Sequence, residues 1–132
     1  MTTIDERPIR ATGGCQCGAL RYKVRGPLRD VLACHCAICR RIHTFMGAYS
    51  ACDPADLEMT GETLRWYEST PAAKRGFCAA CGTHLIWAGT GKSHVSLSAG
   101  SIDEPTGVRL VKHICTNEKG DFYQIADDVP KV

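Results

Sequence analysis

The chemistry offered by this sequence lies in cysteines that gather in three tight clusters. Nine cysteines occur among the 132 residues, and seven of them fall within these clusters. A cysteine thiolate can act as a nucleophile or as a ligand for a soft metal ion. An odd number of cysteines argues against a closed set of disulfides, and pairs separated by one or two residues are typical of zinc sites. The clusters therefore predict a zinc protein.

The first and third clusters share one design, in which glycine directly follows a pair of cysteines. The pairs are Cys15 and Cys17 before Gly18, and Cys78 and Cys81 before Gly82. Glycine permits a left-handed turn that can aim backbone N–H groups at the two sulfurs. Two such knuckles predict one closed, structural zinc site with four cysteine ligands. Each pair taken alone would also suit a redox-active Cys-x-x-Cys motif or two buried thiols.

The second cluster, CHCAICRR at 34–41, places Cys34, Cys36 and Cys39 within six residues. Three thiolates from one segment can occupy three corners of a tetrahedron and leave the fourth open, which is typical of a catalytic zinc. The adjacent Arg40 and Arg41 favour the thiolate forms and could receive an anionic ligand. Lys74 and Arg75 form another basic pair that could receive a small anion.

A distant residue could also close this second site. The residues available are Cys52, Cys115, His35, His43, His84, His94 and His113. His35 lies between two of the ligands and is expected to point away from the metal that they face. Isolated cysteines are mostly small buried apolar residues, so we expect this of Cys52 and Cys115, with a redox or metal-sensing role as the alternative.

Composition limits the other classes of function. The net charge is +2, and the basic residues are scattered, so the basic stripe expected of a nucleic-acid-binding protein is not seen. The opening residues, MTTIDERPIRAT, contain no apolar run and predict neither a signal peptide nor a membrane-spanning segment. Many cysteines without an export signal favour a reducing, cytoplasmic location and metal binding over disulfides.

The hydrophobic pattern indicates a mainly β protein with one or two short helices. Residues 1–12 are expected to form a polar arm, and 13–132 a single domain whose 44% hydrophobic content suffices for one modest core. Alternating or β-branched runs predict strands at 20–24, 64–67, 85–88, 95–99 and 108–114, with 122–125 as a further candidate. Short helices are expected at 37–43 and, after the Asp53-Pro54 start signal, at 54–59.

Three stretches resemble the family of glutathione-dependent formaldehyde-activating enzymes, which also includes centromere protein V. They are GGCQCGALRY (13–22), CHCAICRR (34–41) and RGFCAACGTHL (75–85), with a weaker match in KHICTNEKGDFYQIADDVP (112–130). The resemblance implies several short, coiled antiparallel sheets around zinc knuckles. It also implies two zinc ions, a structural one on Cys15, Cys17, Cys78 and Cys81 and a functional one on Cys34, Cys36 and Cys39.

The resemblance further implies an activity. Family members of known activity join glutathione to formaldehyde and are grouped with carbon–sulfur lyases. A small-molecule thiol would occupy the open corner of the second zinc, and Arg40, Arg41 and Arg75 are the residues expected to bind the substrate. The alternative is a non-catalytic interaction or scaffold module in which both zinc ions are structural.

Overall fold

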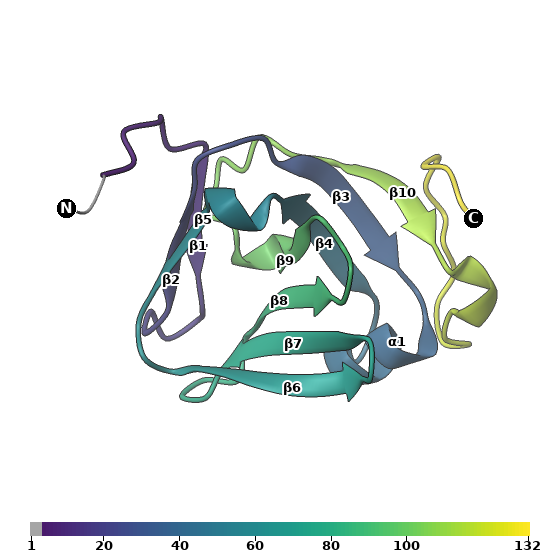
Figure 1. Ribbon diagram of the computed structural model, residues 1–132. Helices are drawn as coiled ribbons and strands as arrows, with labels where there is room; N and C mark the ends of the chain where they lie inside the picture. The colour runs from purple at the N-terminus through teal and green to yellow at the C-terminus, as the bar shows by residue number, and fades with distance from the viewer. Residues whose placement is uncertain (1–3) are drawn as a thin grey trace.

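The computed structural model describes residues 4–132 and consists of two twisted sheets. Figure 1 shows the smaller sheet lying across one side of the larger one. The smaller sheet has the order β1-β2-β5, with antiparallel pairing throughout. Its strands are β1 (Ala11–Gly14), β2 (Arg21–Val24) and β5 (Leu57–Thr60).

The larger sheet has seven strands in the order β10-β3-β4-β9-β8-β7-β6. Neighbouring strands are antiparallel except β10 and β3, which run parallel. The strands are β3 (Arg29–Cys34), β4 (Gly47–Cys52), β6 (Leu64–Thr70), β7 (Ala73–Cys78), β8 (His84–Gly89), β9 (Val95–Ser98) and β10 (Leu110–Ile114).

One short α-helix, α1 (Ala37–His43), follows β3 and carries part of the second cysteine cluster. The Cys36 sulfur caps its start by accepting a hydrogen bond from the Cys39 backbone N–H. Three basic residues in its last turn complement the negative end of the helix dipole. The described residues also form three single-turn 3-10 helices: η1 (Pro54–Asp56), η2 (Ala99–Ser101) and η3 (Thr116–Glu118).

The hydrophobic core lies between the two sheets. Tyr22 and Val24 point into it from the smaller sheet, and Ile86 and Leu97 point into it from the larger one. Because successive side chains of a strand face opposite sides, Trp87 and Ser96 point to the other face of the larger sheet, where they line a cavity. The alternation thus separates a packed face from an open face.

The mainly β prediction is confirmed, and strands occur at five of the predicted positions. The strands of residues 4–132 form two sheets, which are antiparallel as expected except for the parallel pair β10 and β3. Ala11 and Thr12, which fall in the range expected to be an arm, already belong to β1. Residues 1–3 of that arm lie outside the described residues.

Two local predictions are wrong. The helix expected at 54–59 stops after one 3-10 turn, because Leu57–Thr60 pairs along β2 as strand β5. The candidate strand at 122–125 does not form. Phe122 and Tyr123 pack instead against Phe45, outside both sheets. In both cases tertiary contacts decide the local conformation.

Within residues 4–132, no helix is long and apolar enough to cross a membrane.

Candidate metal centres and the adjoining cavity

The first and third cysteine clusters meet in space. The sulfurs of Cys15, Cys17, Cys78 and Cys81 all lie within 4.8 Å of one another. The Cys15–Cys17 sulfur distance is 3.6 Å, and the Cys17–Cys78 distance is 3.8 Å. A tetrahedral zinc with Zn–S bonds of about 2.3 Å separates its sulfurs by about 3.8 Å. The four-cysteine centre therefore fits a zinc ion.

Two glycine turns shape this centre. Gly18 and Gly82 have φ angles of 82° and 81°, and no atom lies near where a Cβ would stand. Each closes a tight turn by donating its N–H to the carbonyl of the first cysteine of its pair, Cys15 or Cys78, at 3.2 and 2.7 Å. The left-handed turns expected from the sequence are thus present.

Hydroxyl groups support the sulfurs of the four-cysteine centre. The Thr83 hydroxyl lies 3.2 Å from the Cys81 sulfur, and the Thr63 hydroxyl lies 3.3 Å from that of Cys78. Hydrogen bonds from the Thr83 side chain and backbone lower the pKa of Cys81 to about 5. These donors favour the thiolate forms that a zinc ion requires.

The second cluster forms a separate three-cysteine centre. Cys34 ends β3, Cys36 caps α1 and Cys39 lies in its first turn. Their sulfurs lie within 4.8 Å of one another, and no fourth cysteine, histidine or carboxylate among residues 4–132 joins the group. Both ring nitrogens of His35 are hydrogen-bonded elsewhere, to Tyr123 and His113, so His35 is not a ligand.

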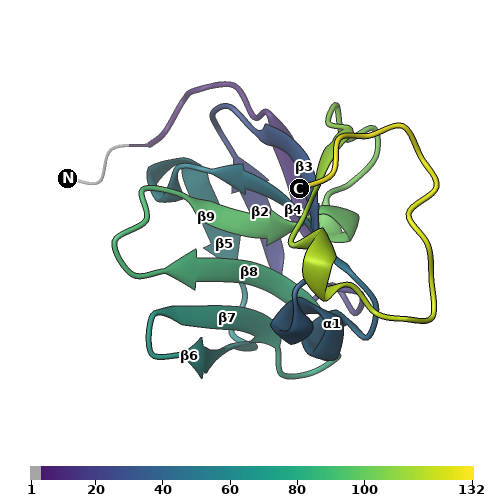
Figure 2. The same cartoon turned by 90° about the vertical axis from the view of Figure 1, so that its right-hand side faces the viewer.

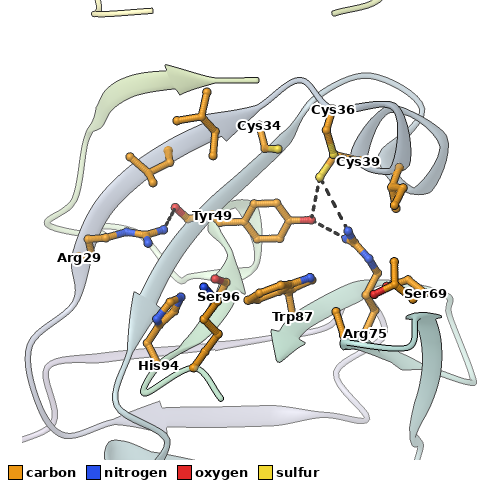
Figure 3. A pocket seen from close by; sticks show the side chains of 16 residues that line it. Arg29, Cys34, Cys36, Cys39, Tyr49, Ser69, Arg75, Trp87, His94 and Ser96 are labelled. Atoms are coloured by element: carbon orange, nitrogen blue, oxygen red, sulfur yellow. Dashed lines mark hydrogen bonds between the residues drawn. The ribbon is translucent and has the colours of Figure 1, made fainter. Parts of the chain in front are cut away.

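The three-cysteine centre opens onto a cavity of about 420 Å³ on the open face of the larger sheet. Figure 3 shows the three cysteines at one end, with Tyr49, Trp87 and Arg75 below them and Arg29 at the opposite end. The lining is Arg29, Leu32, Cys34, Cys36, Ile38, Cys39, Tyr49, Ser69, Thr70, Ala73, Arg75, Trp87, Lys92, His94, Ser96 and Ile114.

A buried arginine ties this centre to the sheet. Arg75 is only 5% exposed; its Nη1 donates to the Tyr49 hydroxyl at 2.8 Å, and its Nη2 lies 3.8 Å from the Cys39 sulfur. No carboxylate of residues 4–132 forms an ion pair with it. Hydrogen bonds from Cys34 and Cys36, together with Arg75, lower the pKa of Cys39 to about 5. A Cys39 thiolate therefore balances the buried guanidinium.

The predicted substrate-binding arginines divide into two groups. Arg75 lines the cavity, whereas Arg40 and Arg41 on α1 do not. The Arg40 stem lies beside Gly120, and Arg41 is exposed. The cavity is instead lined by Arg29, Lys92 and His94, for which the sequence predicts no role in substrate binding. Lys92 and His94 lie around the β8–β9 turn, where sequence pattern carries no signal of a binding role.

The fold and the two cysteine groups define a class: a mainly β protein with one four-cysteine group and one three-cysteine group that could each hold a metal ion, the latter beside a cavity. The model of the family described as glutathione-dependent formaldehyde-activating enzyme matches residues 10–118, and the chain belongs to this family.

Two other proteins are similar to this chain. An uncharacterized lyase of Schizosaccharomyces pombe is 28% identical over 116 residues, which cover 87% of this chain and 85% of that protein. A crystal structure of a Rhodobacter sphaeroides protein superimposes with a TM-score of 0.59 at 23% identity, covering 76% of this chain and 99% of the other. At that identity the second likeness supports the fold alone.

Proposed function

We propose that this protein is a zinc-dependent carbon–sulfur lyase that acts on the adduct of a thiol with a small aldehyde, as in S-hydroxymethylglutathione. The observation that carries the proposal is the three-cysteine centre, which has no fourth protein ligand among residues 4–132 and faces a cavity. Membership of the family and likeness to a lyase-named protein support the same class of reaction.

The donor set suits this chemistry. A zinc ion held by Cys34, Cys36 and Cys39 would supply a soft Lewis-acidic position that favours a substrate thiolate over the thiol at neutral pH. The remaining work falls to the protein. The Tyr49 hydroxyl and the Arg75 guanidinium both contact the sulfur of Cys39 and hold it in place. The Trp87 ring forms an apolar wall along the cavity. Together they hold the thiol against the centre and limit the entry of water.

The charge of the cavity indicates an acidic thiol. Its charged lining side chains besides the cysteines are Arg29, Arg75 and Lys92, and it contains no carboxylate. Arg29 donates through Nη2 to the Tyr49 carbonyl at 3.2 Å and forms no ion pair within the described chain. Burial lowers its pKa, so a carboxylate from a ligand would stabilise its charge. Glutathione offers both a thiol and carboxylates.

The test pairs metal analysis with ligand binding. Purified wild-type protein is expected to contain two zinc ions per chain. A cobalt-substituted sample is expected to change its cobalt–thiolate spectrum when glutathione is added. Cys36→Ser is expected to lose the second metal, the spectral response and the cleavage of S-hydroxymethylglutathione, while retaining its fold by circular dichroism.

Cys115→Ser is the matched control, because Cys115 belongs to neither cysteine group. A Cys36→Ser protein as active as wild type would contradict the proposal. Two tightly bound metals with no spectral response to glutathione would favour a structural, two-zinc module instead.

A further inference from the structure

A chain of hydrogen-bonded polar groups, with two buried histidines at its centre, joins the three-cysteine segment to residues 115–132. His35, between two of the cysteines, is fully buried. Its Nδ1 lies 2.7 Å from the Tyr123 hydroxyl, and its Nε2 lies 2.8 Å from Nδ1 of the buried His113. His113 Nε2 in turn lies 2.9 Å from the Asp127 carboxylate. The reaction described above uses none of these groups.

The four groups satisfy one another in a fixed order. A carboxylate only accepts hydrogen bonds, so His113 must donate from Nε2 to Asp127. With neutral imidazoles, His113 Nδ1 then accepts from His35 Nε2, and His35 Nδ1 accepts from the Tyr123 hydroxyl. Every ring nitrogen is thus paired, as buried polar groups require. A satisfied network built around two buried histidines fixes one geometry for the elements that it connects.

The elements connected are the metal-ligand segment and the C-terminal tail, residues 115–132. The tail leaves β10 and returns beside it, since His113 N–H donates to the Pro130 carbonyl and Val132 N–H donates to the His113 carbonyl. Figure 2 shows the loop of the tail extending outward beyond η3. Tyr123 and Asp127 reach from this loop to the two histidines.

Backbone N–H groups of the three-cysteine segment also contact residues near the C-terminus. The His35 N–H donates to the Ile114 carbonyl at 3.0 Å, and the Ala37 N–H approaches a Glu118 carboxylate oxygen at 3.4 Å. Residues on both sides of Cys36 are therefore held by the last part of the chain. Among residues 4–132, no hydrogen bond joins the tail to Cys15, Cys17, Cys78 or Cys81. Thr63 and Thr83 support the sulfurs of Cys78 and Cys81 instead.

We propose that the C-terminal tail positions the three-cysteine centre through the Tyr123–His35–His113–Asp127 chain and thereby sets the metal affinity of that centre alone. Tyr123, His113 and Asp127 are positioning residues, since they act on Cys34 and Cys36 through His35. The inference rests on the proposed function only in requiring that a metal binds at the three-cysteine centre; it is independent of the substrate.

The test measures the transfer of zinc from the zinc-loaded 132-residue chain to a chromophoric chelator. Cys36→Ser and Cys17→Ser assign the two phases of transfer to the two centres. Tyr123→Phe removes one hydroxyl and Asp127→Ala removes the final acceptor. Each is expected to weaken zinc binding at the three-cysteine centre by about tenfold, the lower end of what loss of a supporting hydrogen bond costs a metal site. Zinc at the four-cysteine centre is expected to be unchanged.

Matched controls separate positioning from general damage. Tyr67→Phe and Asp128→Ala make the same chemical changes at exposed residues outside the chain of hydrogen bonds, and both should release zinc like wild type. Asp127→Asn keeps an acceptor for His113 and should lie closer to wild type than Asp127→Ala. If Asp127→Ala does not fold, Tyr123→Phe still decides the matter, because it retains the ring.

The outcomes are distinct from those of the lyase proposal. Selective weakening of the three-cysteine centre supports the inference even if glutathione is not a substrate. Unchanged zinc transfer in Tyr123→Phe and in folded Asp127→Ala would overturn it, as would parallel weakening of both centres together with a lower melting temperature. A wild-type protein that binds zinc only at the four-cysteine centre would also overturn it.

Discussion

The Arg75 guanidinium lies 3.8 Å from the Cys39 sulfur although the two residues are 36 positions apart in the chain. Arg75 comes from the middle of β7, whereas Cys39 lies in the first turn of α1. The contact therefore joins strand β7, which lines the cavity, to the cysteine-bearing helix α1 at one end of the cavity. It also explains how a cation that is 5% exposed is tolerated without a carboxylate, because the thiolate supplies the opposite charge.

The first prediction concerns this pair. Arg75→Gln removes the charge, retains a polar side chain and leaves the Cys39 thiolate without its partner. We expect the free energy of unfolding of the zinc-loaded protein to fall by about 2 kcal/mol, the usual size of a hydrogen bond to a charged group. Urea titration would measure the loss. Arg65→Gln, on the exposed part of β6, should change stability little, and equal losses in both variants would contradict the role given to Arg75.

The second prediction concerns the selection of an acidic thiol by Arg29. Arg29→Gln removes the cation at the end of the cavity opposite the cysteines. We expect KM for the glutathione adduct to rise roughly tenfold with little change in kcat, because a charge-assisted hydrogen bond to the substrate is lost. The adduct of a glutathione diester should be affected much less, since it lacks the carboxylates. Equal changes in KM for both substrates would show that Arg29 does not recognise the carboxylates of the substrate.

The sequence predicted the grouping of the cysteines far better than it predicted the cavity. Cysteine spacing is a local signal, and the glycine after each knuckle adds a conformational requirement that the structure meets at Gly18 and Gly82. The grouping of four and three sulfurs could therefore be anticipated. The cavity depends instead on which strands become neighbours. Arg29 in β3 and Tyr49 in β4 come together only through pairing in the larger sheet.

Strand β4, which was not predicted from the sequence, was missed for a physical reason. The sequence of β4, GAYSAC, is buried at almost every position and shows no polar alternation, so a period of two cannot be seen in it. The network around His35 was missed for a different reason. Its partners Tyr123 and Asp127 come from irregular chain after η3, where no periodicity relates side chains to a face.

The third prediction separates the two centres by stability. Cys17 is exposed, so Cys17→Ser loses a metal ligand without losing much packing. The four-cysteine centre joins the turn between β1 and β2 to the turn between β7 and β8. Without its zinc we expect a loss of several kcal/mol of folding stability, seen as a lower melting temperature and faster proteolysis. Cys36→Ser should stay folded. If Cys36→Ser is instead less stable than Cys17→Ser, the three-cysteine centre and not the four-cysteine centre has the structural role.

The fourth prediction uses the partly buried His84, which packs edge-on against His43 and hydrogen-bonds Ser98 through Nδ1 at 2.7 Å. Burial, with His43 and Arg75 nearby, lowers its pKa to about 4, whereas an unfolded histidine titrates near 6.5. Between these values the unfolded chain binds the additional proton. The contribution of His84 to stability is therefore present above about pH 6.5 and is lost progressively as the pH falls toward 4.

Integrating this linkage from pH 7.5 to 5.5 gives a loss of about 1 kcal/mol from His84 alone. Urea titrations of wild type and His84→Asn at both pH values would isolate it, because acid effects on the zinc thiolates are common to the two proteins. We expect the wild type to lose about 1 kcal/mol more than the variant over this interval. If the two proteins lose the same amount of stability, the pKa of His84 is not lowered in the folded state. The ring of His84 would then take up a proton in the folded protein, beside the Tyr49–His43 contact.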